Sequence, residues 1–310
     1  MDFISFFVTI AGLAVTVVAS RWVVQNASQL AYGTDVPPYF LGITIVALGT
    51  DGPEIANSIM ASIAGHGDLN VGNATGSVFA QITFALGILP FAAKGFTMGP
   101  WRNAIVPSLT TVALILSGFL FLDGFYSRID GALLVVAYLL ATYYAWKYAQ
   151  PFSEPVLEEP SRSKVGHFLL MIAALGLVVA GAGAAVQGLL GVSATLGVPE
   201  YVVSFFGTSV GTSLPEIVVT IQATKLGQRD LAMGDILGAC LLDSTLASGI
   251  GPVISPTFID TKLAVEGVLL AVVAMAMATV MLWGRGKHDR WSGAVLLLIY
   301  AGAYVVLLDG

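Results

Sequence analysis

The sequence predicts an all-α membrane protein with ten transmembrane helices, arranged as two inverted-topology repeats of five helices each. Three observations predict it. Hydrophobic residues make up 56% of the 310 residues and charged residues only 10%, against about 25% charged residues in ordinary proteins. Apolar runs of about 20 residues follow one another along the chain, and this length crosses a bilayer as a helix. A long segment of the first half is repeated in the second half.

The apolar runs do not alternate with polar residues, which favours helices over a β-barrel. Their lengths and polar borders predict ten helices, over residues 3–22, 38–63, 70–93, 103–122, 129–149, 167–188, 200–224, 231–254, 263–283 and 291–308.

A polar segment rich in proline and glutamate separates the fifth expected helix from the sixth. This composition is typical of a linker. We therefore expect a first five-helix repeat over residues 1–149, a linker over 150–166 and a second five-helix repeat over 167–310.

The positive charges predict how the chain lies in the cell membrane. Eleven of the 13 Lys and Arg residues fall on one side of the expected helices, and only Arg128 and Lys262 fall on the other. Because cytoplasmic loops carry the excess of Lys and Arg, we expect a cytoplasmic linker and both termini outside. The tryptophans stand at expected cytoplasmic helix ends, as in an interfacial belt; they are Trp22, Trp101, Trp146, Trp283 and Trp291.

The repeat spans residues 42–90, which align without a gap onto residues 204–252 with 17 of 49 positions identical. Gly, Pro, Thr and Glu are among the identities, which chance similarity of apolar helices does not explain. Five helices per half send the second copy through the membrane in the opposite direction. Inverted repeats are typical of secondary transporters, with the substrate site at the repeat interface. A duplicated scaffold that transports nothing is the alternative.

Each copy carries a glutamate, Glu54 or Glu216, directly after a proline and about midway along an apolar helix. Proline has no N–H for the carbonyl four residues earlier, here that of Gly49 or Gly211. Such carbonyls are tolerated at membrane depth where they face protein or a wet cavity. The same two turns contain Thr50, Asp51, Thr212 and Ser213. Carboxylates, hydroxyls and carbonyls form the all-oxygen ligand set of hard cations such as Na⁺ and Ca²⁺.

The following helix of each copy supplies a second polar wall. Asn73, Ser77 and Gln81 share one helix face because they are spaced by four residues. Their counterparts are Asp235, Ala239 and Asp243. The same helices carry glycines at small-xxx-small spacing, which permits close helix approach, and plain packing is the alternative reading of these glycines.

Five acids within the expected spans have no Lys, Arg or His in those stretches to pair with; they are Asp51, Glu54, Glu216, Asp235 and Asp243. An unpaired charge at the bilayer centre costs about 2.5–3.5 kcal/mol, so five would consume most of a folding free energy of about 5–15 kcal/mol. The acids must therefore bind cations, protons, or both in turn. The alternative is a structural set of protonated, hydrogen-bonded acids, a reading that applies most readily to Asp235.

The other polar residues predict ordinary structural roles. Asp68 and Asp230 precede expected helices, where N-capping is the default. Lys262 and Glu266 are spaced by four residues and should pair. The single cysteine excludes an internal disulfide and a Cys-based zinc site, and the three histidines lie in loops or near a helix end. The net charge of −6 argues against a nucleic-acid partner.

These residues resemble the cation/calcium antiporter superfamily, most closely its prokaryotic sodium/calcium exchangers. The resemblance covers the whole chain in topology and is most specific in two motifs, G-T-S-x-P-E and G-N-x-x-G-S. Residues 211–216 match the first motif in full, and residues 72–77 match the second. The runs at 122–125 and 129–131 also look like the family.

The resemblance implies an antiporter, not an enzyme, that exchanges calcium or a similar divalent cation for sodium by alternating access. It implies no covalent cofactor and no obligate protein partner beyond the lipid bilayer and the inorganic cations. Glu54 and Glu216 would be the central calcium-binding carboxylates, with Asp243 at a position that bears Asp or Asn. The first and sixth helices would slide as a pair against the other eight. The remaining calcium and sodium ligands would be the backbone carbonyls of Ala47 and Ser209 and the hydroxyls of Thr50, Thr212, Ser213 and Ser77.

The chain also departs from the family pattern. Asp51 stands where the family usually has Ser, Gln81 and Asp235 stand where it has Asn, and Ala239 replaces a Ser. The expected site loses a neutral ligand and gains two acids. The coupling ion, sodium or proton, and the identity of the divalent cation are therefore left open.

Two other function classes remain as alternatives. A passive cation channel would conduct without demanding a counter-ion. An intramembrane aspartyl protease would use paired aspartates, and Met233-Gly234-Asp235 faintly matches its G-x-G-D element. The first glycine of that element is absent, and a protease does not explain the 49-residue repeat.

Overall fold

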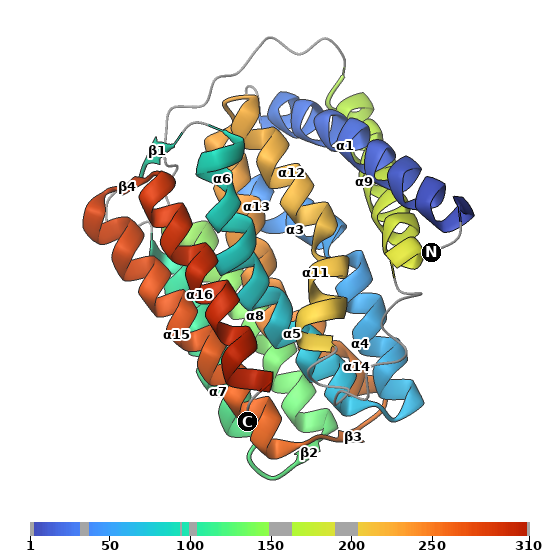
Figure 1. Ribbon diagram of the computed structural model, residues 1–310, viewed down its shortest axis with the longest axis vertical. Helices are drawn as coiled ribbons and strands as arrows, with labels where there is room; N and C mark the ends of the chain where they lie inside the picture. Colours follow the sequence, from blue (N-terminus) through green and yellow to red (C-terminus); the bar gives the residue numbers. More distant parts are fainter. Residues whose placement is uncertain are drawn as a thin grey trace.

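The computed structural model describes residues 3–31, 37–93, 95–98, 104–148, 163–189 and 204–308. These residues are mostly helical, and helical elements lie in every one of the ten predicted ranges (Figure 1). In the labels below, η marks a π-helical stretch. The elements of the first half are α1 (Phe3–Ala31), α2 (Pro38–Leu41), η1 (Gly42–Val46), α3 (Ala47–Thr50), α4 (Gly52–Ala64), α5 (Gly67–Ala80), η2 (Gln81–Ala85), α6 (Leu86–Ala92), β1 (Phe96–Thr97), α7 (Ile105–Leu120), β2 (Phe125–Tyr126) and α8 (Arg128–Tyr148).

The elements of the second half are α9 (Lys164–Leu189), η5 (Ser204–Thr208), α11 (Ser209–Thr212), α12 (Leu214–Lys225), α13 (Arg229–Leu242), η6 (Asp243–Ala247), α14 (Ser248–Ile254), β3 (Thr257–Phe258), α15 (Thr261–Arg285), β4 (Lys287–His288) and α16 (Arg290–Leu308). Most of the predicted linker lies outside the described residues. Its last three residues belong to α9, which begins at Lys164.

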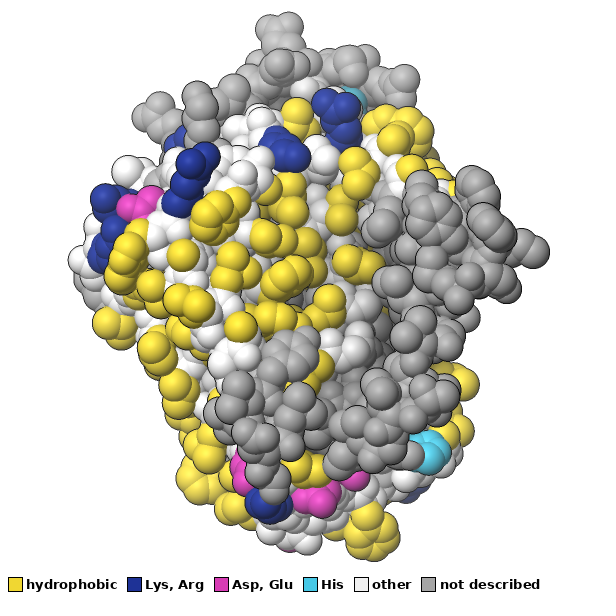
Figure 2. Space-filling view, in the orientation of Figure 1, with side chains coloured by type: hydrophobic (Ala, Val, Ile, Leu, Met, Phe, Trp, Pro, Cys, Tyr) yellow, Lys and Arg dark blue, Asp and Glu magenta, His cyan; other side chains and the backbone are white. Residues whose placement is uncertain are grey.

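Five helices among the described residues are long and apolar enough to cross a membrane, over 67–92, 128–148, 164–181, 229–254 and 261–285. Shorter apolar helices cover 38–50, 105–120 and 290–303. Large apolar side chains such as Phe119, Leu139 and Leu298 are more than half exposed on the surface. On the face shown in Figure 2, hydrophobic side chains cover the middle, most Lys and Arg gather toward the upper end and most Asp and Glu toward the lower end. This distribution is that of a chain that spans a bilayer.

Two helices form the centre of the molecule. Nearly every residue of α5 and all of α13 after Arg229 are buried. Each packs against the broken helix of the other half: α2 and η1 lie on α13, and η5 and α11 lie on α5. Glycines permit this approach, because a Cβ on Gly76 would lie 2.3 Å from the Phe205 carbonyl oxygen and one on Gly238 would lie 2.5 Å from the Ile43 Cα. The predicted close packing at the small-xxx-small glycines is therefore observed.

The irregular features of the first half recur in the second half at the offset of the sequence repeat. The π-helical stretches at 42–46 and 81–85 have counterparts at 204–208 and 243–247. Each lies 162 residues later, as do the starts of α13 and α14 relative to those of α5 and α6. The two copies thus share their helix breaks as well as their sequence.

Helices α1 and α9 pack along each other at one side of the molecule (Figure 1). The Thr16 hydroxyl donates to the Val178 carbonyl at 3.5 Å, and His167 Nδ1 pairs with Asn26 Oδ1 at 2.8 Å. Helix α1 continues nine residues past its predicted end at residue 22, because Val23 and Ala27 extend its buried stripe. The predicted end was therefore too early.

Four short strands were not predicted. β1 pairs antiparallel with β4, and β2 pairs antiparallel with β3. The two pairs lie at opposite ends of the bundle (Figure 1). Strands of two residues have no sequence periodicity, so a pattern of apolar residues does not reveal them.

The structure also tests single-residue expectations. Asp68 is not an N-cap: it lies inside the first turn of α5, and its carboxylate accepts from the Asp260 N–H at 2.6 Å. Asp230 likewise lies inside the first turn of α13. The Lys262–Glu266 pair is confirmed, with 3.9 Å between Nζ and Oε1. Trp22, Trp146 and Trp291 are exposed as an interfacial belt requires, but Trp283 is buried, and Trp101 lies outside the described residues.

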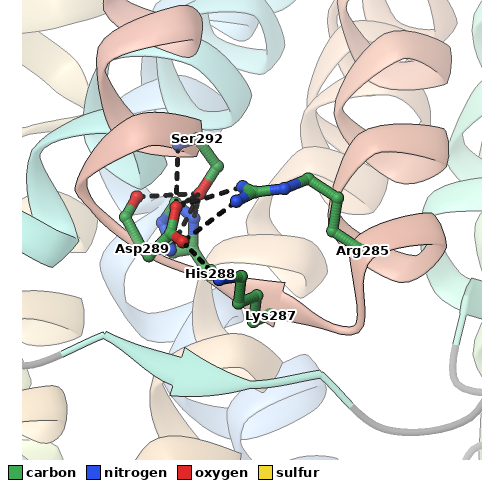
Figure 3. Close-up of polar contacts among 5 residues, drawn as sticks. All are labelled: Arg285, Lys287, His288, Asp289 and Ser292. Carbon is green, nitrogen blue, oxygen red and sulfur yellow. Dashed lines mark hydrogen bonds and ion pairs between the residues drawn. The ribbon is translucent and has the colours of Figure 1, made fainter.

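A proline in each copy leaves a helix carbonyl without its usual donor, and side chains replace that donor. Pro90 removes the partner of the Leu86 carbonyl, which accepts instead from His288 Nε2 at 2.8 Å. Pro252 removes the partner of the Ser248 carbonyl, which accepts from Asn70 Nδ2 at 3.0 Å. Figure 3 shows His288 and its polar neighbours Arg285, Lys287, Asp289 and Ser292, in the turn between α15 and α16.

His288 is held in its neutral form. A carbonyl can only accept, so Nε2 carries the proton, and Nδ1 pairs with the Ser292 hydroxyl at 2.9 Å. Burial lowers the pKa of His288 from 6.5 to about 4. Hydrogen bonds from Arg285 hold the pKa of the neighbouring Asp289 carboxyl below its usual range.

We expect the folded protein to lose stability as the pH falls from 6.5 toward 4. The unfolded chain takes up a proton at His288 in this window while the folded chain does not, so the stabilisation present above pH 6.5 decreases by about 3 kcal/mol. Thermal unfolding of the detergent-solubilised protein measures this change against His288→Gln, which keeps a donor for Leu86 but does not titrate. The same pH dependence in both proteins would contradict the assignment.

Candidate cation-binding site

The site begins at matching breaks in two helices. Helix α3 ends at Thr50, Asp51 leaves the helical conformation at φ −76° and ψ 12°, and α4 resumes at Gly52. Ser213 makes the same break between α11 and α12, at φ −79° and ψ 7°. A proline follows each break by two residues and has no N–H to restore the helical bond. These breaks set the side chains at 51 and 213 beside the glutamates that follow them.

Three carboxylates converge where the broken helices meet. One oxygen each of Asp51, Glu54 and Glu216 lies within 4.8 Å of the others, and the three side chains are at most 1% exposed. No ion pair between described residues reaches any of them. Within the described chain, both carboxylate oxygens of Asp51 and of Glu216, and Oε2 of Glu54, accept no hydrogen bond. A buried group of this kind requires a cation or a proton.

A hydrogen-bonded chain connects this cluster to the second polar wall. Ser213 Oγ donates to Glu54 Oε1 at 3.4 Å, and Gln81 Nε2 lies 3.4 Å from Ser213 Oγ and donates to Asp243 Oδ2 at 2.9 Å. Gln81 and Asp243 are repeat counterparts, and each begins a π-helical stretch. Gln81 Oε1, Asp243 Oδ1 and Ser77 Oγ are buried and have no hydrogen-bond partner within the described chain. Further oxygens without a hydrogen-bond partner in the described chain thus lie beside the cluster.

The predicted hydroxyl ligands are already oriented by their own helices. Thr50 Oγ1 is 3.1 Å from the carbonyls of Val46 and Ala47. Thr212 Oγ1 is 3.2 Å from Asn73 Oδ1 and 3.3 Å from the Ser209 carbonyl. A hydroxyl that donates to a carbonyl keeps its lone pairs for a cation.

The carbonyls of Ala47 and Ser209 are less available. Each accepts a backbone N–H at 2.9 Å, from Asp51 and from Ser213, as well as the neighbouring threonine hydroxyl. The backbone N–H uses one lone pair of each oxygen, and the threonine hydroxyl shares its single proton between this oxygen and a second acceptor.

Asp235 lies apart from the three-carboxylate cluster. It is fully buried in α13, and its Oδ2 accepts from Thr220 Oγ1 at 2.9 Å. Sequence reasoning missed Thr220, although its position four residues after Glu216 places both side chains on one face of α12. The structure thus brings Asp51, Glu54 and Glu216 together and associates Ser213, Gln81 and Asp243 with them.

The arrangement suits hard cations. Among the described residues, the side-chain atoms of the cluster and its neighbours Ser77, Gln81 and Asp243 that lack a hydrogen-bond partner are all oxygens, and the three side chains of the cluster are carboxylates. Since the cluster is closed to solvent, it has the properties of an occluded binding position within the membrane span.

Comparison with known proteins identifies the family of the chain. The family model for the sodium/calcium exchanger protein matches residues 4–147 and 166–308. The chain belongs to this exchanger family. The putative antiporter CaxA of Alkalimonas amylolytica is 28% identical over 317 residues, covering 97% of each protein. The sodium/calcium exchanger MaX1 of Methanosarcina acetivorans is 23% identical over 353 residues, covering 98% of each. A solved structure of the sodium-calcium exchanger NCX_Mj superposes with a TM-score of 0.82 over 99% of this chain and all of that one, at 24% identity.

Membership in the exchanger family decides between an antiporter and an enzyme. The protein is a membrane-embedded cation antiporter and not an enzyme. The fold is that of NCX_Mj. Because the family consists of exchangers, the partial match of residues 233–235 to a protease element does not indicate a protease. The family resemblance expected from residues 72–77 and 211–216 is confirmed.

Proposed function

We propose that this exchanger carries calcium, or a similar divalent cation, in one direction and sodium in the other by alternating access. One observation carries the proposal: three buried carboxylates within 4.8 Å of one another have no positively charged partner among the described residues. The names of MaX1 and NCX_Mj supply the choice of calcium and sodium for this family scaffold.

The same proposal includes the topology. Ten spans form two inverted five-helix repeats, over 1–149 and 167–310, joined by a cytoplasmic linker with both termini outside. The recurrence of helix breaks at an offset of 162 residues supports the repeat, and the Lys and Arg distribution supports the orientation. Helices α1 and α9 would then move as a pair against the rest.

Glu54 and Glu216 bind the divalent cation in this proposal, and Asp51 adds a third carboxylate from the helix break. Thr50, Thr212, Ser213 and Ser77 contribute hydroxyl oxygens, and the amide and carboxylate oxygens of Gln81 and Asp243 complete the shell. Asn73 orients Thr212 through its hydrogen bond. The Ala47 and Ser209 carbonyls would join only where their present hydrogen bonds loosen.

Charge explains why such a site exchanges ions rather than leaking them. Closing an empty site would desolvate three carboxylates, at about 2.5–3.5 kcal/mol for each unpaired charge. A bound cation offsets this cost, so the switch between inward-facing and outward-facing states requires an occupied site. Sodium and the divalent cation compete for overlapping oxygens, which couples their movements.

Reconstituted protein in liposomes tests the proposal. Radioactive calcium uptake is measured with sodium trapped inside, with a pH step and no sodium, and with neither gradient. We expect uptake only with the outward sodium gradient. Uptake driven by the pH step alone would replace sodium with protons as the coupling ion, and uptake without either gradient would indicate a passive channel. No calcium uptake under any gradient would overturn the calcium assignment.

A further inference from the structure

Asp235 is a buried carboxylate that the three-carboxylate cluster leaves unused. It is not among the acids whose oxygens lie within 4.8 Å of one another, and its side chain is 0% exposed. Thr220 Oγ1 donates to Oδ2 at 2.9 Å, while Oδ1 accepts no hydrogen bond within the described chain. Asp235 thus has a hydroxyl beside one carboxylate oxygen, and its other carboxylate oxygen accepts no hydrogen bond from a described residue.

The hydrogen bond to Thr220 links this acid to α12, the helix that carries Glu216. Thr220 follows Glu216 by four residues on α12, so the two Cβ atoms lie about 5–6 Å apart on one helix face. Both carboxylate oxygens of Glu216 are buried and without a hydrogen-bond donor within the described chain. The Thr220–Asp235 pair therefore joins α12 to α13 one helix turn from Glu216.

The first copy has no such feature. The counterpart of Asp235 is Asn73, a neutral side chain whose Oδ1 accepts from Thr212. The counterpart of Thr220 is Ser58, whose hydroxyl accepts from the Gly251 N–H at 3.1 Å. Packing of the repeats therefore does not require an acid and a free oxygen here, and the charge is a property of the second copy alone.

We infer that Asp235, Thr220 and Glu216 form a second cation position that takes a monovalent ion, sodium, beside the divalent cluster. The inference rests on the proposed exchange function. Asp235 adds one negative charge to those of the cluster, and this charge balances one Na⁺. The Thr220 hydroxyl and one oxygen of Glu216 would be the other ligands. A calcium ion requires six to eight oxygens and more carboxylate charge. Glu216 bridges the two positions, so sodium bound here competes with the divalent ion for that carboxylate.

Equilibrium binding of radioactive sodium to the purified protein in detergent tests the position without transport. We expect Asp235→Asn to bind one sodium ion fewer than the wild type, while calcium binding to the cluster persists. Asp230→Asn, which removes another buried acid five residues earlier on α13, is the matched control and should bind as many sodium ions as the wild type. An unchanged sodium count in Asp235→Asn would overturn the inference and leave Asp235 as a protonated structural acid.

Thr220→Val provides a second test that keeps the acid in place. We expect sodium to bind about tenfold more weakly at one position, the scale on which loss of a supporting polar group affects ion sites. Equal sodium affinity would contradict the proposed ligand set. These readouts do not depend on exchange: failure of sodium-driven calcium uptake in the wild type would remove the proposed function and leave the sodium count to decide this position.

Discussion

Replacing either central glutamate with glutamine, as Glu54→Gln or Glu216→Gln, should reduce sodium-driven calcium uptake at least about 100-fold. Each carboxylate is at most 1% exposed and belongs to the cluster of oxygens within 4.8 Å. The carboxylate and the bound cation form a buried charge pair, and removing one partner of such a pair costs about 3–5 kcal/mol. Each 1.4 kcal/mol corresponds to about a factor of ten in affinity. Initial rates in liposomes that contain equal amounts of folded protein measure the loss.

Glu266→Gln is the matched control, because Glu266 is a partly exposed glutamate on α15 that pairs with Lys262 and does not belong to the carboxylate cluster. Its uptake should equal that of the wild type, since exposed pairs contribute little. Near-normal calcium uptake by Glu54→Gln or Glu216→Gln would mean that the cluster does not bind the transported ion, and the proposed function would have to be abandoned.

The second large effect is expected at Gly234, where one added methyl group should prevent the two halves from packing. A Cβ at this position would lie 2.1 Å from the Tyr39 carbonyl oxygen. Backbone atoms cannot turn aside as a flexible side chain can, so Gly234→Ala must separate α13 from α2. Overpacking of a core costs about 1–3 kcal/mol even when side chains yield, and here we expect about 3 kcal/mol or more.

Size-exclusion chromatography and thermal unfolding in detergent measure this loss of folded protein. Gly176→Ala in α9 is the control, because nothing lies within 4 Å of its added Cβ. Alanine is also the better helix former, so this variant should be as stable as the wild type or slightly more stable. Normal yield and stability of Gly234→Ala would contradict the close packing of α13 on the Tyr39 carbonyl.

The elements that follow from local chemistry were predictable. Apolar runs of membrane length revealed the helical ranges, and prolines before Glu54 and Glu216 revealed where two helices break. The identity of residues at an offset of 162 anticipated matched breaks, which the structure has. Ends decided by packing were less predictable: α1 runs on to Ala31 because its buried stripe continues under a polar face.

Contacts of single polar residues were also predictable only where they depend on neighbours in the sequence. Lys262 and Glu266 pair because neighbours on one helix turn meet whatever the rest of the fold does. Asp68 does not cap its helix, because the Asp260 N–H from a distant loop reaches its carboxylate. His288 appeared to be a loop residue and proves to be the donor for the carbonyl that Pro90 leaves without a partner.

The sequence by itself determined that this protein is a helical membrane exchanger with oxygen-rich helix breaks in two related halves. Only the tertiary structure decided which oxygens meet: Asp51 lies with Glu216 across the repeat interface, and Gln81 donates to Asp243, 162 residues away. It also set Asp235 apart with Thr220. Hydrophobic periodicity and proline act within a few residues along the chain. A cation site instead needs atoms within a few ångströms in space, and the packing of α5 and α13 against the opposite half determines those distances.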